Sequence, residues 1–213
     1  MYIYTMNAIL SQQQVSDLAG TYFAPIADVI QQAFQDYLDS LRGINSMGIK
    51  TNLKARTSAS LIHDFIQIRA REKFAHEPHI KVDEFNGMFG LLISKRLFVR
   101  FKKLTPEMKT SNVSTGQTEL FNKQQLEIPG TDKVTMLTAG YVPDVTWTII
   151  QSIFLTCKIN DELVWYKDLH GETSQVSFFS SDAPVASASN VDEPIVRVKE
   201  NNNKQRKTGS DNE

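Results

Sequence analysis

The sequence predicts an α+β fold, in which N-terminal amphipathic helices pack on an antiparallel sheet built from two hairpins. Three observations lead to this prediction. Apolar residues recur at helical spacing near the N-terminus, two later stretches have the pattern of β-hairpins, and the C-terminal stretch is rich in Ser, Asn and charge. Helices and hairpins segregated in this way are typical of α+β domains. We expect a single domain over residues 1–171 and a disordered polar tail over 172–213.

The composition limits which cellular compartment and which class of partner are expected. Of the 213 residues, 41% are hydrophobic, and the net charge is −1, so the global charge favours neither nucleic acid nor a membrane surface. The single cysteine, Cys157, excludes an internal disulfide and fits a reducing compartment. We find no signal peptide and no run of roughly 20 apolar residues that would span a membrane. The expected location is the cytoplasm, without membrane contact.

The first predicted elements are a short apolar segment and a long helix. Residues 2–10 are apolar enough for a strand or a docking segment. Apolar residues then recur at helical spacing from Phe23 to Leu41, with polar residues opposite, which predicts an amphipathic helix. Gly43 is the expected C-terminal stop of this helix.

A second helix is expected from about Leu53 or Ser58 to Ala75. Thr57 is its candidate N-cap, and Pro78 would end it. Its outer and terminal surface carries basic side chains that would extend any cationic surface on the sheet. These are Lys54, Arg56, Arg69, Arg71 and Lys73.

The first hairpin is expected within Asn86–Leu104. Residues 88–93 form an apolar run, which suits a strand covered on both faces, whereas residues 97–103 alternate between apolar and basic side chains. If the next two residues after Ser94 form the turn, Leu92 faces Val99 in the paired strands. The basic residues would then lie over one end of the sheet.

Basic side chains are concentrated in and after this hairpin. Residues 95–109 contain six of them against one acidic residue, Glu107. The six are Lys95, Arg96, Arg100, Lys102, Lys103 and Lys109. Such a cluster can contact phosphates. More often a charge cluster is a solvated outer face that protects a sheet edge, and both interpretations stay open.

A polar connector and a second hairpin complete the domain. Within the connector, residues 115–125 predict a short helix and Pro129-Gly130 a turn. A strand is expected over residues 134–141. The second hairpin, Ile149 to Leu169, would turn at Asn160-Asp161, because both residue types tolerate a positive φ.

Catalytic and cofactor chemistry has little support in the sequence, and we expect no metal and no cofactor. In residues 76–79 the two histidines are three apart, and a proline separates them, so the helical zinc-protease motif does not fit. Asp83 and Glu84, with Lys95 and Lys102 downstream, loosely resemble the acids and lysine of restriction-endonuclease-like folds. A divergent metal-dependent nuclease is therefore an alternative, although no strand carries an acid-x-Lys triplet.

Short motifs give the chain a resemblance to known proteins. FVRFKKL (98–104), SNVSTGQTELFNKQQLEIPG (111–130), TAGY (138–141) and a late Trp165 follow one another. This order resembles uncharacterised bacterial and prophage proteins encoded beside a repressor with helix-turn-helix and zinc-peptidase-like domains. Such gene pairs look like toxin–antitoxin or phage-defence modules. The resemblance covers residues 55–169 and implies that this chain is the growth-inhibiting effector, controlled by the neighbouring repressor.

The sequence therefore favours a non-catalytic interaction or effector protein, with a neighbouring repressor or antitoxin as partner. A nucleic-acid-binding accessory protein that uses the basic hairpin face is the first alternative, and the nuclease is the second. The candidate binding residues are Lys95, Arg96, Arg100, Lys102, Lys103, Asn112, Thr115 and Gln117. In the tail, Glu193–Glu200 is one apolar island, which is either plain tail or a strand for a partner's sheet edge.

Overall fold

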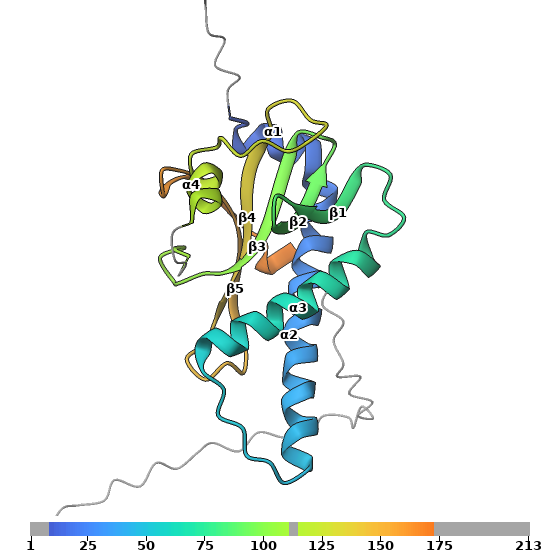
Figure 1. The fold of residues 1–213 in the computed structure, drawn as a ribbon, viewed down its shortest axis with the longest axis vertical. Helices are drawn as coiled ribbons and strands as arrows, with labels where there is room; N and C mark the ends of the chain where they lie inside the picture. The colour runs from blue at the N-terminus through green and yellow to red at the C-terminus, as the bar shows by residue number, and fades with distance from the viewer. Residues whose placement is uncertain (1–8, 111–114, 173–213) are drawn as a thin grey trace, which may run out of the picture. The chain divides into compact units, whose positions relative to one another are not determined.

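The computed structural model describes residues 9–110 and 115–172. Its helices are α1 (Gln12–Ala19), α2 (Phe23–Ser46), α3 (Ala55–Lys73) and α4 (Gly116–Asn122), with 3-10 turns η1 (Gly20–Tyr22) and η2 (His170–Glu172). Its strands are β1 (Ile80–Phe85), β2 (Met88–Ile93), β3 (Leu97–Lys103), β4 (Thr135–Pro143), β5 (Ile150–Ile159) and β6 (Glu162–Asp168). The predicted α+β class is confirmed (Figure 1). These residues belong to the first of two units, 1–175, whereas the predicted tail and its island Glu193–Glu200 lie outside the described residues.

The strands form one sheet in the order β1-β2-β3-β4-β5-β6. All neighbours are antiparallel except β3 and β4, which run parallel with Arg100 opposite Thr138. The sheet is therefore larger than two hairpins. A parallel pair requires a crossover connection, and here the polar connector carries the chain from the end of β3 back to the start of β4.

The predicted first hairpin is confirmed as the antiparallel pair β2–β3, and a further strand, β1, precedes it in the sheet. β1 pairs with β2, and the turn between them is Asn86-Gly87, with φ of 49° and 73°. Two consecutive positive φ angles match the tight turn that an Asn-Gly pair favours. Asp83 and Glu84, the acidic residues of the nuclease alternative, consequently lie on strand β1.

The β2–β3 link takes three residues and shifts the expected register by one. Ser94 and Lys95 adopt φ of 49° and 54°, and Leu92 faces Phe98 instead of Val99. The basic residues do not gather at one end of the sheet, because the turn and the far half of β3 are separated by the length of the strand. The β5–β6 turn is as predicted, since Asn160 and Asp161 have positive φ.

The helix boundaries differ from the predicted ones for local reasons. α2 continues through Gly43 to Ser46, and the first positive φ after it is that of Gly48, at 81°. α3 begins after Lys54 without a side-chain cap, so Thr57 lies inside the helix.

α1 had no counterpart in the sequence prediction. Ser11 accepts a hydrogen bond from the backbone of Gln14, whose side chain accepts one from the backbone of Ser11. This reciprocal capping box starts the helix.

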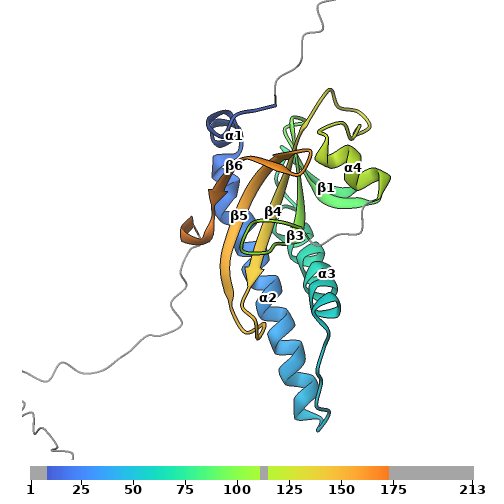
Figure 2. The same ribbon diagram turned by 90° about the vertical axis from the view of Figure 1, so that its left-hand side faces the viewer.

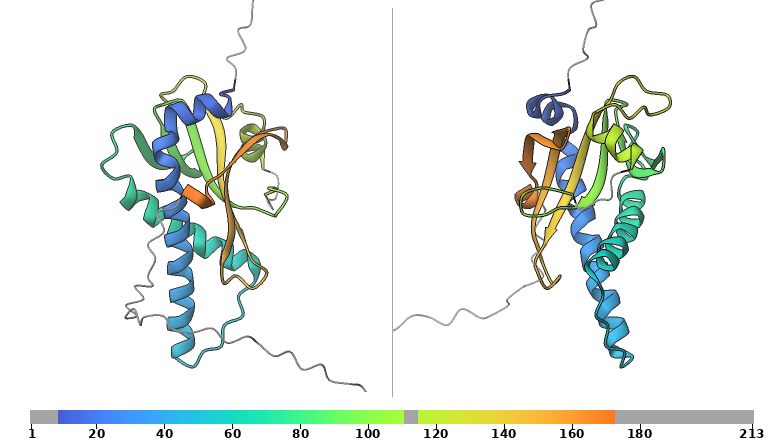
Figure 3. Two further views of the ribbon diagram at one scale, coloured as in Figure 1. Left: turned by 180° about the vertical axis from the view of Figure 1, so that it is seen from behind. Right: turned by 60° about the vertical axis from the view of Figure 1, so that its left-hand side comes forward.

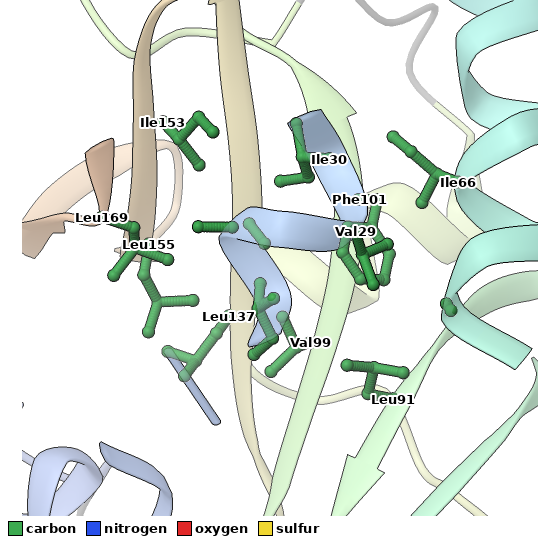
Figure 4. Close-up of a cluster of buried hydrophobic side chains, with 14 of the residues drawn as sticks. Val29, Ile30, Ile66, Leu91, Val99, Phe101, Leu137, Ile153, Leu155 and Leu169 are labelled. Carbon is green, nitrogen blue, oxygen red and sulfur yellow. The ribbon is translucent and has the colours of Figure 1, made fainter. Parts of the chain in front are cut away.

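The sheet has a different cover on each face. α1, α2 and α3 pack on one face, where Ile30 and Ile66 belong to the same main core as Val99 and Leu137 (Figure 4). α4 covers the other face, where its Phe121 joins a second core cluster (Figures 2 and 3).

The buried amide of Gln124 fixes the connector beside α4 on the sheet. It hydrogen-bonds the backbone N and O of Met136 at 2.7 and 2.8 Å, and the backbone O of Lys158 at 2.9 Å. The residues that follow α4 are therefore tied to both β4 and β5.

Candidate functional site

A cavity of about 790 Å³ lies where the β2–β3 pairing ends. The pairing stops at Gly90 and Arg100, whereas β3 continues to Lys103 and pairs only with β4 there. The walls of the cavity come from the first half of α3, the β1–β2 turn, the end of β3 and the start of α4. We call it the α3–β3 cavity.

Arg100 is buried, at 4% exposure, beside this cavity. Its guanidinium stacks on the ring of Phe121 at 3.7 Å and donates to Thr138 Oγ1 at 3.1 Å and Asn122 Oδ1 at 3.3 Å. Asn122 in turn donates to Asp161 at 2.7 Å. Burial lowers the pKa of Arg100 to about 10, against a smaller raising effect of Asp161. The hydrogen-bond acceptors of the guanidinium are therefore neutral groups, which orient the charge without compensating it.

Three further cations line the same cavity: Arg56, Lys102 and Lys103. Burial, and then the charge of Arg100, lower the pKa of Lys102. The ammonium group of Lys103 lies 5.2 Å from the centre of the Trp147 ring. Within residues 9–110 and 115–172, none of the four cations forms an ion pair, and Asp64 is the one carboxylate in the lining. The described lining thus carries four cations against one carboxylate, an excess of positive charge.

Two neutral polar side chains complete the buried wall. Burial, and then the charge of Lys102, lower the pKa of His63, whose ring lies edge-on to Phe89. The hydroxyl of Tyr141 is buried and finds no hydrogen-bond partner among the described residues. Because buried polar groups are rarely left unpaired, such a hydroxyl beside a cavity indicates a place where a ligand or solvent atom binds.

The start of α4 supplies uncharged hydrogen-bonding groups. The side chain of Thr115 caps the helix by accepting a hydrogen bond from the backbone of Thr118, and both residues line the cavity. Gln117 also lines it, and its side-chain amide reaches the β1–β2 turn at Gly87. These groups, together with the four cations, are suited to hold an anion with several oxygen atoms.

The cavity brings together most of the candidates derived from the sequence. They are Arg100, Lys102, Lys103, Thr115 and Gln117. Lys95 and Arg96 instead line a different cavity, of about 850 Å³, together with Lys133. Asn112 lies outside the described residues.

The predicted basic cluster is therefore divided in two. Lys95 and Arg96 precede β3, whereas Lys102 and Lys103 end it, and a strand advances about 3.3 Å per residue. Six residues of strand therefore place the two groups about 20 Å apart.

The basic residues of the second helix lie in different surroundings. Arg56 joins the cavity, as the sequence allowed, but Arg69 pairs with Asp36 and Lys73 with Asp28. His63 and Tyr141 were not among the candidates. Sequence offers no signal for them, because their position depends on how α3 and β4 pack.

The residues considered for nuclease or metal chemistry do not converge. Asp83 is paired with Lys81 on β1, and Lys95 lies in the other cavity. Among the described residues, His, Cys, Asp and Glu form no group of three that could hold a metal ion. Cys157 is buried, and burial raises the pKa of its thiol to about 12.

No family model, curated protein sequence or solved structure matches this chain. In the part of the chain that the structure describes, no helix combines the length and the apolar character needed to cross a bilayer. A function for this chain is therefore inferred from the geometry of the α3–β3 cavity.

Proposed function

We propose that this chain is a binding protein that holds an anionic group of its partner in the α3–β3 cavity. The observation that carries the proposal is Arg100, a buried guanidinium held by neutral acceptors and a ring. A buried charge is costly without an opposite charge. An anionic ligand would supply that charge.

The arrangement of the other groups supports binding of an anion rather than general solvation of the sheet. Lys102 and Lys103 extend from neighbouring positions of β3, and Arg56 approaches from α3. Solvated lysines on an edge strand would lie in open water, whereas burial lowers the pKa of Lys102. The cations thus converge on one hollow from separate elements.

The experiment measures binding of two polyanions, poly-glutamate and a single-stranded oligothymidylate, at several salt concentrations. Lys102→Glu should weaken binding of at least one of them by about tenfold or more, because charge-assisted hydrogen bonds contribute about 1.5–3 kcal/mol. It should also reduce the slope of log affinity against log salt.

Two charge-matched controls locate the effect. Lys50→Glu changes an exposed lysine in the α2–α3 link, and Lys95→Glu changes the cavity at the other end of β3. Both should bind within about twofold of the wild type, since isolated surface charges contribute less than about 1 kcal/mol. Equal losses in all three variants, or no loss in Lys102→Glu, would contradict the proposal.

An effector role in a toxin–antitoxin or phage-defence locus stays a prediction that is compatible with this function. Two of the stretches that resemble such proteins, residues 98–104 and 138–141, are neighbouring parts of β3 and β4. Both reach the α3–β3 cavity through Lys102, Lys103 and Tyr141. A partner bound there would act on the same stretches that carry the resemblance.

A further inference from the structure

The two edge strands of the sheet, β1 and β6, differ in how they are protected. Natural edge strands are commonly protected from pairing by charged side chains. β1 carries three of them between its apolar ends, Lys81, Asp83 and Glu84. In β6 the charged residues lie only at the two ends, at Glu162 and at residues 167–168. β6 is therefore the less protected edge of the sheet.

The middle of β6 is apolar and exposed to solvent. Leu163, Val164 and Tyr166 are 43%, 51% and 47% exposed. The ring of Tyr166 lies edge-on to the ring of Phe154 on the neighbouring strand β5, with 5.8 Å between the ring centres. An exposed apolar edge strand of this kind readily pairs with another strand.

The outer backbone groups of β6 are available for such a pairing. Leu169 donates its backbone N–H to the backbone O of Ile153 on β5. Because alternate residues of an antiparallel pair bond to the same neighbour, the backbone groups of Val164 and Tyr166 point away from β5. Within residues 9–110 and 115–172, no strand pairs with this outer side of β6 (Figure 2).

We propose that β6 pairs with β6 of a second copy of this chain, antiparallel and about a two-fold axis, so that two sheets join into one. The distribution of charge supports a second copy as the occupant, because the strand is complementary to itself. Asp161 and Glu162 make its start acidic, and Lys167 lies near its end. An antiparallel pair places the start of one strand beside the end of the other. This interface is separate from the α3–β3 cavity.

The charges also select the register of the two strands. Side chains on the same face meet across a two-fold axis that is perpendicular to the sheet, so one residue lies opposite its own copy. With Val164 at this centre, Asp161 lies opposite Lys167 of the second copy. With the next residue at the centre, Glu162 would lie opposite Asp168, and like charges in that position are unfavourable. The pairing centred on Val164 is therefore the expected one.

The first test is sedimentation velocity of the full-length chain at about 1 to 100 µM, a range in which small interfaces form and dissociate. The wild type should shift from monomer to dimer as its concentration rises. Val164→Lys should stay a monomer, because it places two like charges opposite each other at the centre. Ile68→Lys is the matched control, since Ile68 of α3 is also 51% exposed, and it should dimerise like the wild type. Circular dichroism checks that both variants are folded.

The second test is cross-linking under mild oxidation, which reports the register. Val164→Cys should form a disulfide-linked dimer, because each Cys lies opposite its own copy. Tyr166→Cys should not, because its two copies would be four residues out of register, about 13 Å apart along the strands. The wild type should not cross-link either, because its Cys157 is buried.

A monomer at every concentration, or equal dimerisation of the wild type and Val164→Lys, would overturn the inference. So would equal cross-linking of the two cysteine variants. Hydrogen exchange adds a further outcome: if the amides of Val164 and Tyr166 are protected to the same extent at every protein concentration, the same chain covers the edge and the inference fails. Lys102→Glu should dimerise like the wild type, so the failure of this inference and that of the proposed function are distinguishable.

Discussion

Arg100 combines the contacts that orient a cation with the burial that makes its charge costly. Phe121 supports the face of the guanidinium, while Thr138 and Asn122 accept its hydrogen bonds. Removing one of these partners would not remove the charge. It would release the side chain from the geometry in which it lines the cavity.

Lys102 gives a pH dependence to the site. Burial and the neighbouring Arg100 lower its pKa below the ordinary 10.5, so its ammonium form, and with it the attraction for an anion, is lost as pH rises through that lowered value. Affinity for poly-glutamate should therefore fall as the pH rises, and the fall should begin at a lower pH than for a lysine with the ordinary pKa of 10.5.

The control is Lys102→Arg, which keeps its charge to higher pH. Its loss of affinity should begin at higher pH, and anisotropy titrations from pH 7 upward measure the difference. An identical pH profile for the wild type and the variant would show that Lys102 is not the titrating group.

At the scale of elements, the end of β3 and β4 approach each other closely at Gly140. A Cβ atom placed there would lie 2.3 Å from the side chain of Leu104, which is fully buried. Gly43, in the last turn of α2, has no atom near the corresponding position. One glycine is thus required by packing, and the other is not.

Alanine substitutions should separate the two glycines. Gly140→Ala should destabilise the fold by about 1–3 kcal/mol because it overpacks a filled region. Gly43→Ala should stabilise it by up to about 1 kcal/mol because alanine favours a helix interior. Urea unfolding followed by circular dichroism measures both, and a stabilising Gly140→Ala would contradict the packing of Leu104 on β4.

Elements with strong local signals could be predicted from sequence. The stripe of α2 and the Asn160-Asp161 turn are of this kind. β1 and α1 also have local signals in the sequence, namely the Asn86-Gly87 turn and the capping pair that starts at Ser11. The parallel β3–β4 pair had no local signal, because it depends on the path of a long connector.

For the candidate site, the sequence predicted several of the residues but not their arrangement around one cavity. Arg100 and Lys102 stood out as basic positions of a strand, and Thr115 and Gln117 as polar positions of the connector. These residues share a cavity because the crossover between β3 and β4 brings the connector to the end of β3. Lys95 lines a different cavity because it lies in the β2–β3 turn, at the other end of the strand. Charge counting alone cannot separate a buried arginine from a solvated lysine.

For the whole molecule, the predicted effector role leads to a growth experiment. Induced expression of residues 1–213 in a bacterial host should slow growth, and co-expression of the neighbouring repressor should restore it. If the α3–β3 cavity holds the cellular target, cells that express the Lys102→Glu variant should grow normally. Cells that express the Lys50→Glu variant should be inhibited as strongly as those that express the wild type. Normal growth with the wild-type chain alone would count against the effector role, and immunoblots would control for expression.

The parallel pairing of β3 and β4 also bears on the order of folding. The β1–β2, β2–β3 and β5–β6 hairpins join neighbouring segments, but Arg100 and Thr138 are 38 residues apart in the chain. Closing a loop of that length has an entropic cost that local hairpins avoid, so such contacts form slowly. Thr138 reaches Arg100 only after that closure. The ability to bind should therefore emerge in the last kinetic phase of refolding, and a chain released half-folded would remain inert.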